Sequence, residues 1–116
     1  MEILLLEETD TVSRVALIGM LDTASIRHVE VKFLAATVAR GKHAIVDISQ
    51  MSFIASLGMG MLVGAHKGLR RKGAKLVLLN PQRDVAEALA VARLVDLLLI
   101  AFDEAEAQQH LAEADS

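Results

Sequence analysis

Two short aliphatic runs constrain the fold of this chain more than any other feature. Residues 44–48 read Ala-Ile-Val-Asp-Ile, and residues 76–79 read Leu-Val-Leu-Leu. Runs of this kind are typical of strands that are buried on both faces of a sheet, as in parallel sheets covered by helices. The segment between them is long enough for the helical crossover that a parallel pair of strands requires. The runs therefore predict two strands, over 43–48 and 75–79, in a helix-covered sheet.

The remaining segments extend this alternation. Residues 3–6 and 12–21 are interpreted as strands of a hairpin, and 97–102 as a last strand. Apolar residues recur on one helical face from Ala24 to Arg40, and Gly41 follows as a stop. Further helices are predicted from Ser56 or Leu57 to 72, after 81 and after 103. We therefore predict an α/β fold, a mixed, mainly parallel sheet of about five strands covered by about four helices in the order β-β-α-β-α-β-α-β-α, as a single domain over 1–116.

The composition excludes several classes of protein. Hydrophobic residues make up 53% of the 116 residues but aromatic residues only 3%, so the core must be aliphatic. The chain has no cysteine, which excludes disulfides, thiol catalysis and zinc fingers, and its four histidines are scattered, so we expect no metal site. A net charge of −3 and few aromatic side chains argue against a nucleic-acid surface.

The sequence also predicts where in the cell the protein is found. No stretch of about twenty apolar residues is available to span a membrane. Residues 1–8 contain acids where a secretory signal carries Lys or Arg. We therefore expect a cytoplasmic protein without membrane insertion.

Three loops qualify as sites, because ligands of open α/β sheets gather at the carboxyl ends of the strands. They are Asp22-Thr23, 53–58 and Asn80-Pro81. The second loop places Ser56 at a helix start, where free N–H groups and the helix dipole tolerate a phosphate. Alternatively, Ser56 simply caps that helix, which residue type alone favours.

Residues 47–60 resemble the signature of the STAS domain of bacterial anti-sigma-factor antagonists. That signature runs Asp-aliphatic-Ser, a few variable residues, Phe, an aliphatic residue, Asp-Ser-Ser/Thr-Gly, an aliphatic residue and Gly. The matching places are filled by Asp47, Ile48, Ser49, Phe53, Ile54, Ser56, Gly58, Met59 and Gly60. The resemblance continues in 19–22 (Gly-Met-Leu-Asp) and in 73–81, so it covers essentially the whole chain.

The resemblance implies a non-enzymatic protein that switches partners. In this family the antagonist binds an anti-sigma factor, usually a serine kinase of the histidine-kinase-like ATPase fold, and frees the sigma factor. The kinase phosphorylates one serine of the antagonist, and a phosphatase resets it. The resemblance implies that Ser56 is the phosphorylated residue of this chain. We expect a partner surface formed by Asp22, Thr23, Phe53, Ala55, Ser56, Leu57, Gly58 and Met59.

The apolar residues Phe53, Ile54, Leu57, Met59 and Met61 cluster around Ser56 in the sequence, and we expect some of them at the surface as a docking patch. A homodimer is compatible with the resemblance. Nothing in it implies a catalytic residue, a metal or a cofactor.

Two residues beside Ser56 depart from the family pattern. Ala55 stands where the family has Asp, and Leu57 where it has Ser or Thr. These departures keep a second function open, that of a STAS subunit that binds constitutively in a larger complex such as a lipid transporter.

The remote third alternative is a small enzyme or nucleotide-binding protein. It rests on Gly58, Gly60 and Gly64, whose spacing is close to a dinucleotide fingerprint. Such a fingerprint should directly follow its strand and needs an acid about twenty residues later, and neither condition is met. We therefore interpret Gly60, Gly64 and Gly68 as a smooth helix face against which a neighbouring element packs closely.

Overall fold

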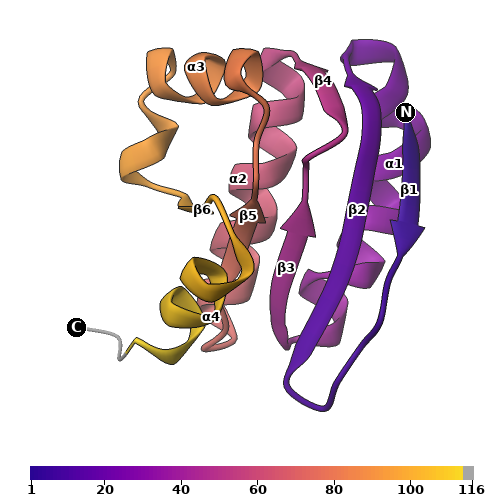
Figure 1. The fold of residues 1–116 in the computed structure, drawn as a ribbon. Helices are drawn as coiled ribbons and strands as arrows, with labels where there is room; N and C mark the ends of the chain where they lie inside the picture. The colour runs from indigo at the N-terminus through magenta and orange to yellow at the C-terminus, as the bar shows by residue number, and fades with distance from the viewer. Residues whose placement is uncertain (114–116) are drawn as a thin grey trace.

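The computed structural model describes residues 1–113 and shows a mixed sheet (Figure 1). The strands are β1 (Glu2–Leu5), β2 (Val12–Leu21), β3 (His43–Asp47), β4 (Met51–Ile54), β5 (Leu76–Leu79) and β6 (Leu99–Ala101). The sheet order is β1-β2-β3-β5-β6, with β4 paired to the far end of β2. The β1–β2 pair is antiparallel, whereas every other pair is parallel. The predicted fold class is confirmed.

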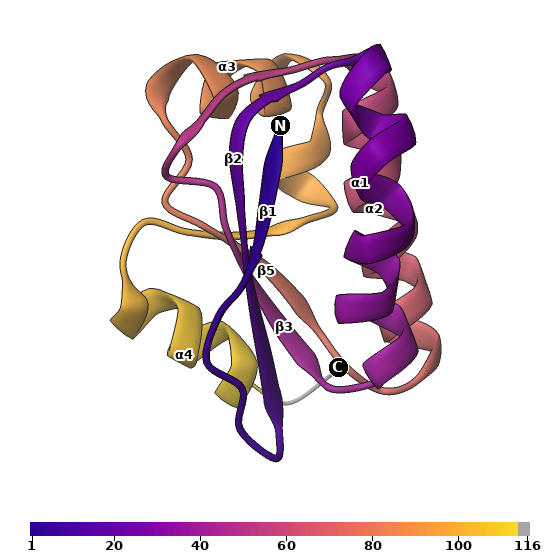
Figure 2. The ribbon, with the colours of Figure 1, turned by 90° about the vertical axis from the view of Figure 1, so that its right-hand side faces the viewer.

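The helices cover both faces and one end of this sheet (Figure 2). They are α1 (Thr23–Ala36), α2 (Ser56–Arg71), α3 (Arg83–Val91) and α4 (Glu104–Ala112). Helices α1 and α2 lie side by side on one face, α4 covers β5 and β6 on the other, and α3 lies across the end of the sheet near β4 (Figure 2). The main core fills the space between the sheet and the α1–α2 layer, and it is aliphatic except for Phe33. A smaller cluster lies under α4.

One strand and two boundaries differ from the prediction. Strand β4 was expected to be part of a loop, because only its end residues, Met51 and Ile54, are buried and no alternation marks it. The first helix ends at Ala36, where the Thr37 hydroxyl donates to the Phe33 carbonyl at 2.8 Å, and a 3-10 turn (Val38–Arg40) continues to Gly41. Gly41 ends this helical segment, as predicted, and has a φ of 69°. The last strand is shorter than 97–102 because 94–96 forms a 3-10 turn.

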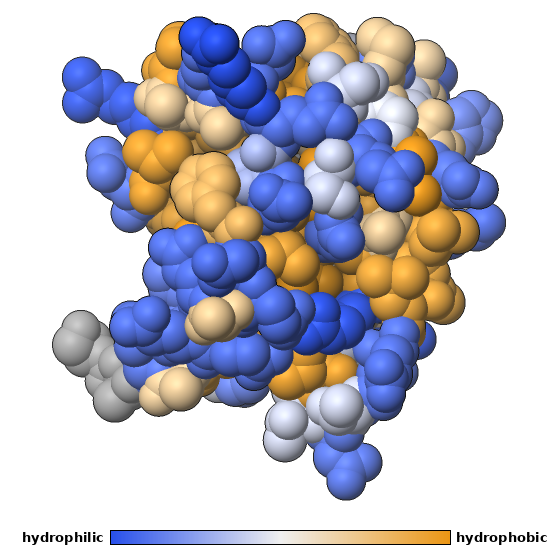
Figure 3. Space-filling view, in the orientation of Figure 1, coloured by the Kyte–Doolittle hydropathy of each residue, from blue (hydrophilic) through white to orange (hydrophobic). Residues whose placement is uncertain are grey.

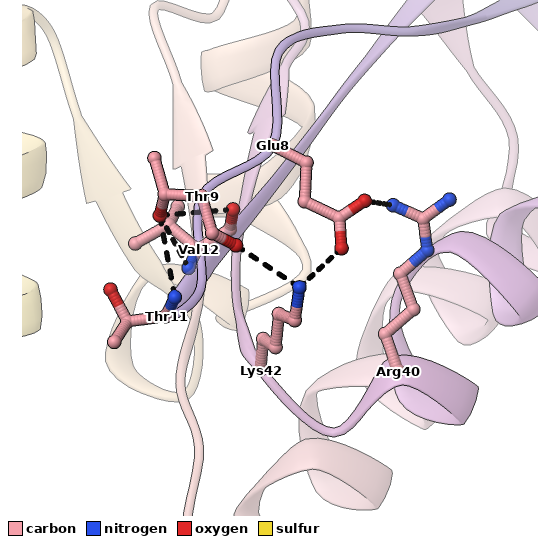
Figure 4. Close-up of polar contacts among 6 residues, drawn as sticks. All are labelled: Glu8, Thr9, Thr11, Val12, Arg40 and Lys42. Atoms are coloured by element: carbon pink, nitrogen blue, oxygen red, sulfur yellow. Dashed lines mark hydrogen bonds and ion pairs between the residues drawn. The ribbon is translucent and has the colours of Figure 1, made fainter.

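The hairpin of β1 and β2 is tied to the neighbouring segments by ion pairs (Figure 4). The Glu8 carboxylate contacts both Arg40 and Lys42, and Lys42 Nζ also donates to the Thr9 carbonyl at 3.0 Å. The hydrogen bond from Lys42 is the main reason that the pKa of Glu8 is lowered. These contacts hold the turn of the hairpin against the start of β3.

On the α4 side of the sheet, Glu104 of α4 pairs with Arg14 near the start of β2, and Val12 packs against the cluster under α4. Strand β1 and the rest of β2 lie outside these contacts. Figure 3 shows apolar side chains gathered over β1 and β2 on the right of the molecule. Leu4, which pairs with Ala16 across the hairpin, and Leu6 are each 40% exposed. This surface is separate from the end of the sheet at which the predicted site lies.

Candidate functional site

Two strand ends bring the predicted site together. In the parallel β2–β4 pair, Met20 lies beside Phe53 and Leu21 beside Ile54. The Ala55 N–H donates to the Leu21 carbonyl at 2.9 Å, which extends the pairing by one residue. Each strand then leads directly into a helix, so α1 and α2 begin next to each other at this end of the sheet (Figure 1). Residues 22–23 and 55–59, which are far apart in sequence, therefore share one surface.

Asp22 is the N-cap of α1. Its carboxylate accepts from the Ser25 N–H at 2.9 Å, and the Ser25 hydroxyl accepts from the Asp22 N–H at 2.9 Å. This reciprocal pair satisfies two backbone donors at the helix start. The hydrogen bond from the Ser25 backbone holds the pKa of Asp22 below its usual range. Asp22 thus has a structural role, and its contact with a partner stays a prediction, as does that of Thr23, the exposed first residue of α1.

Helix α2 begins differently. Its N-cap is Ala55, which has no side-chain group to accept from the first N–H groups. Ser56 is the first residue of the helix rather than its cap, so the alternative that Ser56 serves as the N-cap is wrong. The Ser56 side chain is exposed, and within the described residues its hydroxyl has no hydrogen-bond partner. The site therefore presents a free hydroxyl at an uncapped helix start.

Exposed apolar side chains flank this hydroxyl. Phe53 is 46% exposed and Leu57 is 58% exposed. Met20 is 49% exposed and lies beside Phe53 across the β2–β4 pair. Sequence reasoning missed Met20, because only the pairing of β2 with β4 places it beside Phe53.

The other members of the predicted patch belong to the core. Ile54 and Met61 are buried, and Met59 is half-buried against the main cluster. Gly58 is buried under Leu21, so its place in the motif has a packing reason. The exposed apolar side chains at this end of the sheet are therefore Met20, Phe53 and Leu57, and their role as a docking patch stays a prediction.

The first residues of the motif shape the chain that leads to the site. The Asp47 carboxylate accepts from the Ser49 N–H at 2.9 Å, which closes the turn between β3 and β4. The Gln82 side chain, just before α3, donates to the Ser49 carbonyl at 2.9 Å. The Asp47 carboxylate and the Ser49 backbone thus hold the turn that leads to the site.

The described residues also bear on other kinds of site. Among residues 1–113, no group of three or more His, Cys, Asp or Glu side chains is placed to hold a metal ion. In the same part of the chain no helix is both long and apolar enough to cross a membrane. Of the three glycines behind the nucleotide-binding alternative, Gly58 packs on Leu21, whereas a Cβ at Gly60 or Gly64 would meet no heavy atom of the described residues within 4 Å.

Comparison with known proteins supports the same fold and family. The family model described as STAS domain matches residues 4–109. No curated protein matches the chain significantly. The predicted extent of the domain, 1–116, stays a prediction.

Several solved structures share the fold. An anti-sigma factor antagonist from Mycobacterium paratuberculosis has a TM-score of 0.81 at 19% identity, covering 97% of this chain and 96% of that one. An anti-sigma-factor antagonist (STAS) domain protein from Planctomyces limnophilus has a TM-score of 0.79 at 18% identity, covering 96% and 98%. The Bacillus cell fate determinant SpoIIAA in its phosphorylated form has a TM-score of 0.68 at 22% identity, covering 94% and 98%. At these identities the likeness shows the fold alone.

Proposed function

Because this chain belongs to the STAS domain family, we propose that it is a non-enzymatic binding module that exchanges protein partners when Ser56 is phosphorylated. The observation that carries the proposal is the exposed, unbonded Ser56 hydroxyl at the start of α2. A kinase can reach such a hydroxyl without unfolding any element. The solved structure of SpoIIAA in a phosphorylated form supports the proposal by analogy.

The surroundings of Ser56 suit a charge switch. Unmodified, the site offers Met20, Phe53 and Leu57 as an apolar docking patch for a protein partner. A phosphate adds about −1.5 to −2 charges, which would have to be desolvated on docking. The uncapped N–H groups at the start of α2 stabilise that charge within the free protein. Phosphorylation therefore weakens the complex and leaves the fold intact.

The proposed partners follow from the family. We assign the role of anti-sigma factor to a serine kinase of the histidine-kinase-like ATPase fold, and a phosphatase resets Ser56. We place the protein in the cytoplasm, where such kinases act. The family is generally non-enzymatic, and this assignment needs no catalytic residue in the chain itself.

The test uses a matched pair of serines. Incubation with a co-encoded kinase and ATP should add one phosphate, seen by mass spectrometry, and Ser56→Ala should abolish it. Ser52→Ala removes another exposed hydroxyl, on β4, and should leave the modification unchanged. Ser56→Asp should weaken kinase binding in calorimetry, whereas Ser52→Asp should affect it far less. No phosphate with any co-encoded kinase would contradict the proposal.

A second function is favoured by Ala55 and Leu57. Leu57 adds an exposed apolar side chain where the family pattern has a hydroxyl, and Ala55 removes the acid beside the serine. Both changes suit a permanent apolar interface, as in a constitutive subunit of a larger complex such as a lipid transporter. In that case Ser56→Asp should leave partner affinity unchanged, whereas Leu57→Asp should abolish binding.

A further inference from the structure

A groove of about 470 Å³ runs between α1 and α2, and Met20, Phe53 and Leu57 of the docking patch are not among its lining residues. Small or aliphatic residues form most of its lining, namely Leu34, Ala35, Val38, Ala39, Gly60 and Gly64. Ala35, Ala39, Gly60 and Gly64 are exposed. Val31, on the same side of α1 as Ala35, is 78% exposed. The groove is therefore an apolar surface formed by two parallel helices.

Packing within one chain does not account for two glycines of this groove. A Cβ added at Gly68 would lie 2.9 Å from Val38, so Gly68 allows the two helical segments to meet. A Cβ added at Gly60 or Gly64 would meet no heavy atom within 4 Å. The predicted close packing at these two positions is thus wrong for the single chain. Each glycine within a helix lowers its stability by about 1 kcal/mol relative to alanine, and no packing contact in the described part of the single chain offsets this loss at Gly60 or Gly64.

The charges of the groove lie at its two ends. Val38 contacts Gly68, so Glu30, about two turns before Val38, lies near the level of Gly60. Arg71 is the last residue of α2, at the opposite end. Both side chains line the groove, and within the described residues neither has an ion-pair partner.

We propose that this groove is the interface of a homodimer, in which the α1–α2 pair packs on the same pair of a second copy. A two-fold axis across the groove makes the helices antiparallel and brings Glu30 of each copy to Arg71 of the other. Two such ion pairs then close the two ends. The small side chains of the lining let the helix backbones approach closely, which gives Gly60 and Gly64 their packing role. A second copy satisfies this charge pattern without any further partner.

The first test separates docking from folding. Gly64→Leu fills the groove at a position that is open in the monomer, so it should abolish the dimer in sedimentation velocity without lowering the melting temperature. Gln109→Leu adds the same side chain on exposed α4 and should leave the dimer unchanged. A wild-type protein that stays monomeric near millimolar concentration would overturn the proposal. A dimer that Gly64→Leu leaves intact would overturn it as well.

The second test examines whether the two copies pair Glu30 with Arg71 across a two-fold axis. Glu30→Arg and Arg71→Glu each place like charges at both ends of the groove, and each should raise the dimer dissociation constant about tenfold. Mixing the two variants should restore association as a heterodimer, and the double variant should dimerise alone. Failure of the mixture to associate would rule out this pairing. Neither test involves a kinase, so the result is independent of the proposal for Ser56.

Discussion

Gly58 lies so close to Leu21 that a Cβ on Gly58 would be 2.7 Å from Leu21 Cγ and 3.0 Å from the Leu21 carbonyl oxygen. This contact joins the first turn of α2 to the end of β2. A glycine is needed there for space and not for backbone conformation, and the structure around Ser56 depends on it.

Gly58→Ala should therefore destabilise the protein by about 1–3 kcal/mol, the usual cost of overpacking a core. The control is Gly60→Ala on the same helix, where the added Cβ meets open space. That substitution should stabilise the monomer by about 0.5–1 kcal/mol, since alanine is the better helix former. Urea unfolding at a concentration below dimerisation measures both. Equal effects at the two positions would contradict the contact with Leu21.

Ala55→Asp should stabilise the protein by about 1 kcal/mol, because it supplies the missing cap of α2. A carboxylate at this position can accept from the N–H groups of the first turn, as Asp22 does in α1. The control is Ala90→Asp, an exposed position in the last turn of α3, where a negative charge opposes the helix dipole and should destabilise slightly. Thermal unfolding of both variants gives the comparison. A loss of stability in Ala55→Asp would show that the helix start does not accept a cap.

The strands of this fold could be predicted where burial determines the residue types. The run 44–48 and the run 76–79 are apolar because both faces of β3 and β5 are covered, so sequence and structure agree there. Strand β4 could not be found in this way. Two of its four residues face solvent, and its partner, Gly19–Leu21, is distant in the sequence and carries a register shift.

The same distinction applies to the site, where local features could be predicted and features that depend on distant residues could not. The motif around Ser56 is local, so its position at a helix start was predictable. The neighbourhood of Met20 depends on the β2–β4 pairing, and the choice of Ala55 over Ser56 as N-cap depends on backbone geometry. Likewise, the sequence pattern of Gly60, Gly64 and Gly68 shows that they share a helix face, but only the position of Val38 distinguishes the packed glycine from the open ones.

Lys75 should contribute to stability by holding the end of α4. It is only 7% exposed, and its Nζ donates to the His110 carbonyl at 2.8 Å and to the Glu113 carbonyl. Lys75→Met keeps the aliphatic stem but removes the donor, so it should destabilise the protein by about 1–3 kcal/mol. The control Lys67→Met lies on the exposed side of α2 and should change stability by less than about 0.5 kcal/mol. Hydrogen exchange should locate the loss in α4.

His66 should make the stability of the fold depend on pH. It is 8% exposed, and burial, reinforced by the nearby charges of Arg70 and Lys67, lowers its pKa from the ordinary 6.5. The unfolded chain therefore binds the proton more readily than the folded one. Stability is full above pH 6.5 and is lost as the pH falls through the folded pKa of this group, with a slope of at most about 1.4 kcal/mol per pH unit.

His66→Gln removes this titration and keeps a neutral polar side chain of similar size. Its free energy of unfolding should be lower than that of the wild type at pH 7.5, because the ring is packed in the core, but it should fall less steeply below pH 6.5. Urea unfolding at intervals between pH 7.5 and 5 measures both slopes, and the shared carboxylates cancel in the difference. Parallel curves for the two proteins would show that His66 is protonated as easily in the fold as outside it.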